Sequence, residues 1–277
     1  MTWLRLARRL SGIALLALSL YAAPEQAHLS ERPGGETAAR ALYDGTAGTA
    51  PDRQGWAYVT RNGPAVRANQ GGATLIDTTA SRGMWAGYAA SAAGFLGSSA
   101  PVPTLDRGAG YTITFAARVE QEDHSAASAD KNKDGVADRA GFSAIAISSD
   151  KRGIELGFWE DQIWAQEDGA REPPGGTLFT HAEGATFDTT TTITYTLAIA
   201  GDGYQLSSGD KVILRGPLRD YSAFQAPIDP YETPSFLFFG DNTGTSSGRF
   251  WLSYVAVAAP SGAPSGSRQY LPLIMRR

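Results

Sequence analysis

The segment 130–141, DKNKDGVADRAG, carries oxygen donors at the spacing of a calcium-binding loop. Calcium takes about six to eight oxygen ligands, and the pattern D-x-[DN]-x-[DN]-G brings alternate side-chain oxygens around one point. Gly135 stands where such a loop bends sharply. The candidate calcium ligands are Asp130, Asn132, Asp134, Val136 through its carbonyl, and Asp138. We expect an extracellular type of affinity, with a Kd on the order of 10⁻⁴ to 10⁻³ M.

The loop departs from an EF-hand at its last position. An EF-hand needs a bidentate Glu there, whereas this chain has Gly141, and no helix is predicted on either side. The loop instead resembles those of dockerins and thrombospondin type 3 repeats. Its missing ligand would come from elsewhere, with Glu122 or Asp123 as candidates. The competing interpretation is an exposed acidic turn between two strands, in which Lys131 and Lys133 partly offset the acids.

A second group of chemically useful residues lies in the segment 153–166, GIELGFWEDQIWAQ, which predicts a β-hairpin. With Glu160 and Asp161 as a two-residue turn, alternate residues fall on opposite faces of the hairpin. The core face would consist of Leu156, Phe158, Ile163 and Ala165. The other face would carry the candidate ligand-binding residues Glu155, Trp159, Gln162, Trp164 and Gln166.

Two interpretations of this second face are open. Flat aromatic rings stack on sugars, and Gln or Glu side chains bind hydroxyl groups, so an exposed face would be a carbohydrate platform. Alternatively, Trp159 and Trp164 pack beneath a neighbouring strand or loop, because tryptophan is highly buried on average. Gly157 opposite Trp164 also fits ordinary packing. Solvent exposure of the two rings decides between these interpretations.

The sequence shows no catalytic constellation. Glycosidases use paired carboxylates, but neither Glu155 nor Glu160 begins the strand motif E-x-D-x-x-E. The motifs G-x-S-x-G and H-E-x-x-H and a phosphate loop are absent. His181 is expected to be a half-buried strand residue, and Asp241 with Asn242 is expected to cap a turn. We therefore expect a protein that is not an enzyme, with a glycoside hydrolase or lyase as the less favoured alternative.

A β-rich framework must position these residues. Hydrophobic residues make up 42 % and charged residues 19 %, with 32 glycines, which suits many strands joined by tight turns. The predicted strands lie near 54–60, 73–78, 84–90, 110–120, 141–148, 153–159, 162–166, 177–182, 192–200, 203–207, 211–215, 235–239 and 249–257. About a dozen strands in one stretch predict an all-β fold, a two-sheet antiparallel jelly-roll sandwich.

The two ends of the chain are expected to lie outside this sandwich. Arg5, Arg8 and Arg9 precede a short apolar stretch at 11–23, which is typical of a signal peptide and too short to span a membrane comfortably. We predict a signal peptide at 1–23, a linker at 24–40, the sandwich at 41–258, and a Pro/Ser/Gly linker with a short tail at 259–277. The protein would be extracellular or on the cell surface, with no membrane span in the mature chain.

Composition limits the partners and the means of stabilisation. The net charge of −4 gives no basic footprint for nucleic acid. The chain has no cysteine, so an exported domain cannot rely on disulfides and needs a large core or a bound metal.

Several strings resemble the choice-of-anchor Y type of bacterial surface domain, within the concanavalin A-like (laminin G-like) jelly-roll class. They are the segments 137–166, 178–191 and 236–257, which begin ADRAGF, LFTHAEG and FLFFGDNTG. The resemblance implies two antiparallel sheets with one concave face. We expect an exported, non-catalytic binding module, stabilised by calcium, whose partner is a glycan or a cell-envelope component. The alternative is a structural or adhesion domain with no small ligand.

Overall fold

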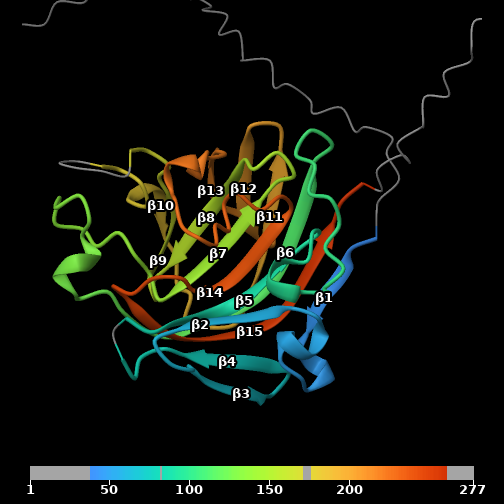
Figure 1. Cartoon of the computed structure of the whole chain (residues 1–277), viewed down its shortest axis with the longest axis horizontal. Coiled ribbons are helices and arrows are strands. Elements are labelled where there is room, and N and C mark those ends of the chain that lie inside the picture. Colours follow the sequence, from blue (N-terminus) through green and yellow to red (C-terminus); the bar gives the residue numbers. More distant parts are fainter. Residues whose placement is uncertain (1–37, 82, 171–175, 261–277) are drawn as a thin grey trace, which may run out of the picture. The chain divides into compact units, whose positions relative to one another are not determined.

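The computed structural model describes residues 38–81, 83–170 and 176–260, and these form two antiparallel β-sheets stacked face to face (Figure 1). The predicted fold class, an all-β antiparallel sandwich of two sheets, is confirmed. Among the described residues, no helix is long and apolar enough to cross a membrane. The helical elements are single 3-10 turns, namely η1 (Gly45–Ala47), η2 (Pro51–Gln54), η3 (Phe95–Gly97), η4 (Ala127–Ala129) and η5 (Tyr221–Ala223).

The larger sheet has eight strands. They are β1 (Arg40–Asp44), β3 (Val66–Gln70), β4 (Ala73–Asp77), β6 (Tyr111–Asp123), β11 (Ile193–Ala200), β12 (Gly203–Ser208), β13 (Lys211–Pro217) and β15 (Ser247–Ala258). Their order is β13-β12-β11-β6-β15-β4-β3, and β1 pairs with β15 as well. The long strands β6 and β15 lie at its centre and carry the inner face of the sandwich.

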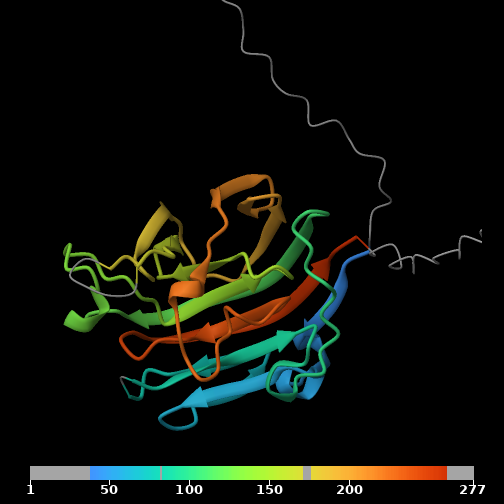
Figure 2. The ribbon, with the colours of Figure 1, turned by 45° about the horizontal axis from the view of Figure 1, so that its top comes forward.

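The smaller sheet has seven strands and carries the candidate site. They are β2 (Ala57–Arg61), β5 (Trp85–Ser91), β7 (Phe142–Ile147), β8 (Gly153–Phe158), β9 (Gln162–Gln166), β10 (His181–Thr186) and β14 (Phe236–Asp241). Their order is β10-β9-β8-β7-β14-β5-β2. Figure 2 shows the curvature of the sandwich, with the segment around η5 (orange) lying across this sheet.

The main core lies between the sheets, where alternate residues of each strand point inward. Phe115 of β6 stacks on Tyr195 of β11 with ring centroids 5.1 Å apart, and it also contacts Phe158 and Phe239 of the opposite sheet. These rings are almost fully buried. A core of this size stabilises the fold in a chain without cysteine.

The outer face of the seven-stranded sheet is apolar as well. In β14, Leu237 and Phe239 point into the main core, whereas Phe236 and Phe238 belong to a second cluster on the outer face. Segments between the strands cover this outer face, so every residue of β7, β8 and β14 is buried. A sheet covered on both faces reads as a continuous apolar run rather than an alternating one.

The predicted hairpin at 153–166 forms in the predicted register. Leu156 pairs with Ala165, Gly157 with Trp164, and Phe158 with Ile163. The predicted core face is confirmed, because Leu156, Phe158, Ile163 and Ala165 all belong to the main core.

The predicted strands differ from the observed ones in three places. The strands β1 and β3 were not predicted, and β10 begins at His181 rather than near residue 177. The strand β3 is exposed along its whole length, so it lacks the apolar alternation that identifies a half-buried strand. The predicted signal peptide, most of the predicted linker at 24–40, and the tail after residue 260 lie outside the described residues.

Candidate ligand pocket

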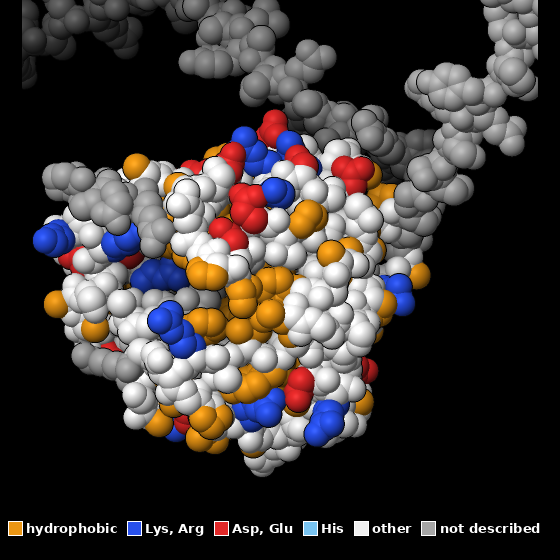
Figure 3. Space-filling view, viewed as in Figure 1, with side chains coloured by type: hydrophobic (Ala, Val, Ile, Leu, Met, Phe, Trp, Pro, Cys, Tyr) orange, Lys and Arg blue, Asp and Glu red, His pale blue; other side chains and the backbone are white. Residues whose placement is uncertain are grey.

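A cavity of about 850 Å³ opens on the outer face of the seven-stranded sheet. Its floor is made by β2, β5, β7 and β14, and its walls come from the segments 95–96, 128–139, 224–231 and 242–245 together with Phe179. Figure 3 shows hydrophobic side chains gathered in the middle of this face, with Lys and Arg side chains beside them. A cavity of this size falls within the range of small-molecule sites.

Seven aromatic residues among those that the structure describes line the cavity. They are Trp85, Phe95, Phe179, Phe224, Tyr231, Phe236 and Phe238. The ring of Phe95 stands edge-on to Phe236 at 5.0 Å, and Phe224 stands edge-on to Tyr231 at 5.2 Å. These contacts hold the rings in fixed positions before any ligand arrives, and such edge-to-face pairs are favourable beyond their buried area.

Exposed apolar side chains stand at the rim of the pocket. Leu96 is 52 % exposed and Ile228 is 54 % exposed, and both line the cavity beside Pro227 and Pro230. Leu96 has a φ of +47°, which is an uncommon backbone conformation for a residue other than glycine. Apolar surface therefore continues from the interior of the pocket to its mouth.

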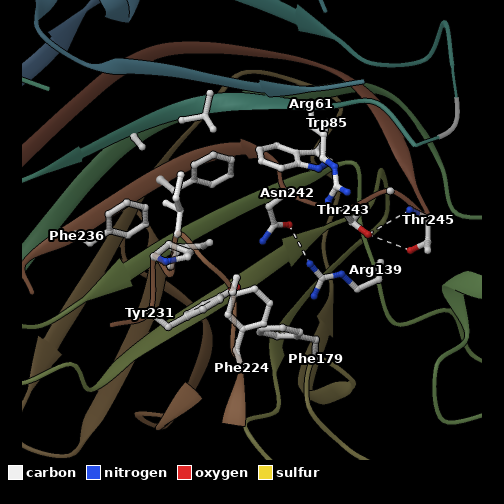
Figure 4. A pocket seen from close by; sticks show the side chains of 18 of the residues that line it. Arg61, Trp85, Arg139, Phe179, Phe224, Tyr231, Phe236, Asn242, Thr243 and Thr245 are labelled. Carbon is white, nitrogen blue, oxygen red and sulfur yellow. Dashed lines mark hydrogen bonds between the residues drawn. The ribbon is translucent and has the colours of Figure 1, made fainter. Parts of the chain in front are cut away.

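Polar side chains gather on one side of the cavity, and most of the labelled aromatic rings lie on the other side or below (Figure 4). The labelled polar residues are Arg61, Arg139, Asn242, Thr243 and Thr245. Arg139 Nη2 donates to Asn242 Oδ1 at 3.0 Å, and the guanidinium lies over the Phe179 ring at 4.9 Å. The pocket therefore has an apolar body and a polar end.

Glu155 lies buried beneath this polar end and anchors it. Its carboxylate accepts hydrogen bonds from Asn242 Nδ2 at 2.9 Å and from the Tyr231 hydroxyl, and Arg139 Nη2 lies 3.4 Å from Oε1. Burial next to this carboxylate raises the pKa of Tyr231 well above its usual value, desolvation being the larger cause, so the phenol keeps its proton. The backbone N–H of Glu155 donates to Tyr221 Oη at 3.0 Å.

The charged side chains that line the cavity are all cationic. They are Arg61, Lys131 and Arg139, and no Asp or Glu occurs among the described residues of the lining. Lys131 Nζ donates to the Leu178 carbonyl at 2.5 Å and lies 5.7 Å from the centre of the Phe179 ring. Glu155 lies beneath the lining and pairs with Arg139.

The candidate platform of Trp159 and Trp164 is not exposed. This corrects the assignment of the two residues as candidate ligand-binding residues and favours the alternative, in which they pack beneath a loop. Trp159 is 8 % exposed and Trp164 is fully buried. The segment around 137–140 covers both rings, and Trp159 Nε1 donates to the Arg139 carbonyl at 3.0 Å. His124 stacks on Trp159 at 3.9 Å, and His181 packs against Trp164 at 4.1 Å. No flat ring face is left for a sugar here.

The two glutamines of the same predicted face differ in exposure. Gln166 is fully buried, and its Nε2 donates to the Asp138 carbonyl at 3.1 Å. Gln162 lies partly exposed at the end of the hairpin, opposite Thr186 of β10. Of the five predicted ligand-binding residues, Glu155 is the one that lies directly beneath the cavity.

The acidic loop folds around its own backbone N–H groups. Asp130 Oδ2 accepts from the N–H of Gly135 at 3.0 Å, and Asp134 Oδ1 accepts from the N–H of Val136 at 2.8 Å. Asn132 Oδ1 accepts from the N–H of Asp134 at 3.1 Å. The side-chain oxygens of Asp130, Asn132 and Asp134 thus serve the backbone of the loop, and Asn132 Nδ2 also donates to Asp134 Oδ2 at 2.9 Å.

Asp138 is turned away from this set. It is fully buried, and its carboxylate accepts from the backbone N–H groups of Lys131 at 2.6 Å and His181 at 3.1 Å. Burial raises the pKa of Asp138. Asp138 thus ties the loop to β10, and the described residues contain no cluster of three or more His, Asp or Glu side chains arranged for a metal.

Sequence reasoning missed most of the pocket. Asn242 was expected only in a turn, and the turn does form, because Asp241 Oδ1 accepts from the N–H of Thr243 at 3.0 Å. Arg139, Tyr231 and Trp85 carried no signal, since they lie far apart along the chain. One signal was present in FLFF at 236–239, where four consecutive aromatic or aliphatic residues indicate a strand with two apolar faces.

No family model and no curated protein matches this chain. Solved structures similar to it include a carbohydrate esterase from the Shiga toxin-encoding bacteriophage phi24B, at 14 % identity and a TM-score of 0.48, covering 80 % of this chain and 100 % of that one. Another is a protein of unknown function with a galectin-like fold from Bacillus subtilis, at 9 % identity and a TM-score of 0.45, covering 79 % and 96 %. A third is a carbohydrate-binding module from Bacillus subtilis, at 11 % identity and a TM-score of 0.34, covering 73 % and 91 %. These values are too low to assign a family or an activity.

Proposed function

We propose that this protein is a non-catalytic binding module that holds a small molecule in the pocket on the outer face of the seven-stranded sheet. The observation that carries the proposal is the cavity itself, which has an apolar aromatic body and one polar end. Most ligand sites have this composition, in which apolar walls supply affinity and a few polar groups fix the orientation. The ligand should have an apolar body.

The exposed rim argues for a ligand rather than for a purely structural role. Soluble proteins rarely leave large contiguous apolar surfaces open to water, and those that do use them for binding. Leu96 and Ile228 extend the apolar lining to the surface. A structural or adhesion domain without a small ligand, which is the alternative, would gain nothing from this arrangement.

The pocket also supports the non-catalytic part of the proposal. Its described lining contains neither a histidine nor a carboxylate, so it lacks the paired carboxylates of glycosidases and the usual general bases. Glu155 is committed to three neighbouring side chains and lies beneath the lining. The polar side chains that do line the pocket, such as Arg139 and Asn242, can orient a ligand by hydrogen bonds.

A glycan is the second candidate ligand. The Trp85 ring is partly exposed in the pocket, and Asn242, Thr243 and Thr245 could bind sugar hydroxyls beside it. The apolar composition of the remaining walls favours a ligand with a larger apolar body. We further propose that the chain is exported, on the charge and hydropathy of residues 1–23, and that it is a choice-of-anchor Y type surface domain, on the strings given above.

Binding of a neutral fluorescent probe tests the proposed function. N-phenyl-1-naphthylamine should gain fluorescence on binding to the wild-type protein. Ala89 lies on the cavity floor, so Ala89→Phe should fill the pocket and weaken probe binding at least tenfold. Val212→Phe adds the same ring at an exposed site on β13 and should leave probe binding unchanged. Equal binding to all three folded proteins, or no binding to the wild type, would contradict the proposal.

A further inference from the structure

The charge and hydrogen-bonding groups of the polar end narrow the ligand class, given the proposed function. We propose that the pocket binds an anionic amphiphile, which is a molecule with one acidic head group on a hydrocarbon or aromatic body. The head would lie at the end formed by Arg61, Lys131 and Arg139, and the body would lie against the aromatic walls.

Charge balance is the first argument. Three cationic side chains line the cavity, and no carboxylate does so among its described residues; Glu155 lies beneath the lining, 3.4 Å from Arg139. Arg139 is buried beside apolar walls, which lower the local dielectric constant, so its charge acts more strongly on a ligand than it would on an open surface. Arg61 and Lys131 are solvent-exposed and add a weaker attraction. These three side chains disfavour a cationic ligand and favour an anionic one.

Hydrogen bonding at Arg139 is the second argument. Its Nη2 already serves Asn242 and lies near Glu155, whereas its Nη1 is buried without a hydrogen-bond partner among the described residues. A buried guanidinium N–H without an acceptor is costly, and a guanidinium presents its donors in a fork that matches a carboxylate or a phosphate. The oxygen atoms of an acidic head group would satisfy this donor.

The position of Arg139 is fixed before a ligand binds. Its guanidinium is held by Asn242 on one side, by Glu155 beneath, and by the Phe179 ring, 4.9 Å from its central carbon. Arg139 is 9 % exposed, and its backbone carbonyl accepts from Trp159 Nε1 and Ser246 Oγ, each at 3.0 Å. Such preorganisation reduces the entropy lost on binding.

The shape of the apolar part is the third argument. Apolar side chains line the cavity from its floor, at Phe236 and Phe238, to the exposed residues Leu96 and Ile228. An apolar chain can therefore lie against these side chains and reach the surface of the protein. Polar groups on one side of the cavity and apolar walls on the other (Figure 4) match an amphiphile better than a sugar, whose hydroxyls are distributed around the whole ring.

A matched pair of ligands tests the inference in competition with N-phenyl-1-naphthylamine. Decanoate and decan-1-ol share a ten-carbon chain and differ in the charge of the head group. We expect decanoate to displace the probe at a concentration at least tenfold lower than decan-1-ol. Decyltrimethylammonium, which carries the opposite charge, should be the weakest competitor of the three.

Charge variants locate the head group. Arg61→Gln and Lys131→Gln each remove one charge and keep an amide donor. Each variant should raise the concentration of decanoate needed to displace the probe at least threefold, and should leave the concentration of decan-1-ol unchanged. Arg215→Gln removes an exposed charge from β13, outside the pocket, and should change neither. Equal effects on decanoate and decan-1-ol would show that the variants act through the fold, and would overturn the assignment of the head group.

A second assay distinguishes the two possible sources of the acidic head group, a membrane lipid and a free acid. Co-sedimentation with phosphatidylglycerol vesicles, but not with phosphatidylcholine vesicles, together with probe displacement would identify a membrane lipid. Displacement by decanoate without co-sedimentation would identify a free acid. Both results support the inference.

Other outcomes overturn it. If the neutral probe binds and Ala89→Phe abolishes binding, but decan-1-ol competes as well as decanoate, the anionic inference fails and the proposed function stands. If neutral oligosaccharides displace the probe and decanoate does not, the ligand is a glycan. If the probe does not bind the wild-type protein at all, both proposals fail.

Discussion

Asn242 Nδ2 donates a hydrogen bond to Glu155 Oε1 at 2.9 Å, and this contact ties the turn after β14 to the middle of β8. The two residues are 87 positions apart in the chain. The Tyr231 hydroxyl donates to the other oxygen of the same carboxylate. A buried acid thus joins three distant segments and holds the polar end of the pocket in place.

Removing the Tyr231 hydroxyl should destabilise the protein. Tyr231→Phe leaves Glu155 Oε2 without its donor, and an unsatisfied buried polar group costs about 1–3 kcal/mol. Chemical denaturation measures the loss. Tyr195→Phe is the matched control, because the Tyr195 ring is equally buried and its hydroxyl has no partner among the described residues. Equal stability of the two variants would refute the role given to Glu155.

Filling the space above Gly157 should disturb the buried tryptophan. A Cβ at Gly157 would lie 2.6 Å from the Trp164 ring, which the loop around 137–140 prevents from moving away. We expect Gly157→Ala to lower the free energy of unfolding by about 1–3 kcal/mol through overpacking. Gly203→Ala provides the comparison, since its nearest contact is an ordinary 3.5 Å and no strained φ is involved. A wild-type melting temperature for Gly157→Ala would contradict the packing described here.

The free energy of unfolding should depend on pH because of the buried carboxyl of Asp241. Burial raises the folded-state pKa of this carboxyl well above the 3.8 of the unfolded chain. The folded state therefore holds the proton more tightly, and the stabilisation is complete below pH 3.8 and is lost as the pH rises through the folded-state pKa.

Asp241→Asn should flatten that dependence and make the protein more stable than the wild type at pH 8. The amide can donate to Thr78 Oγ1, because the Thr78 hydroxyl can turn to the Gly248 carbonyl, 3.2 Å away. Urea melts at pH 5 and pH 8 provide the measurement. A variant that is less stable than the wild type at pH 8 would show that the charged form is well accommodated.

Calcium should raise the melting temperature if the acidic loop binds it. At 100 times its Kd, a ligand that binds only the folded state adds about 2.7 kcal/mol. The melt is measured in millimolar calcium and again in chelator. Asp130→Asn and Asp134→Asn should abolish the difference, whereas Asp210→Asn, at an exposed turn, should preserve it. Superimposable wild-type melts in calcium and chelator would exclude the metal.

The sequence predicted the local geometry well. The register of β8 and β9 follows from a two-residue turn and a period of two, and both are short-range properties. What covers the second face of this hairpin was not predictable, because alternation separates two faces without showing which is solvent-exposed. The covering segment around 137–140 comes from before β7.

The pocket could not be assembled from sequence for the same physical reason. Arg139 and Asn242 are 103 positions apart, and each lies in a loop whose path depends on how the sheets stack. Trp85 lies on β5, which neighbours β14 on the side opposite β7, and it lines the same cavity. The types of these residues indicate hydrogen bonding and stacking, but only the fold brings them together.

The most direct test of the pocket and its polarity is a crystal structure of the protein soaked with 2-naphthoate. The proposed polarity of the pocket predicts density for the rings against Phe236 and Phe238, with the carboxylate within hydrogen-bonding distance of Arg139 or Arg61. A naphthoate bound in the reverse orientation, or bound elsewhere while the pocket holds only water, would contradict it.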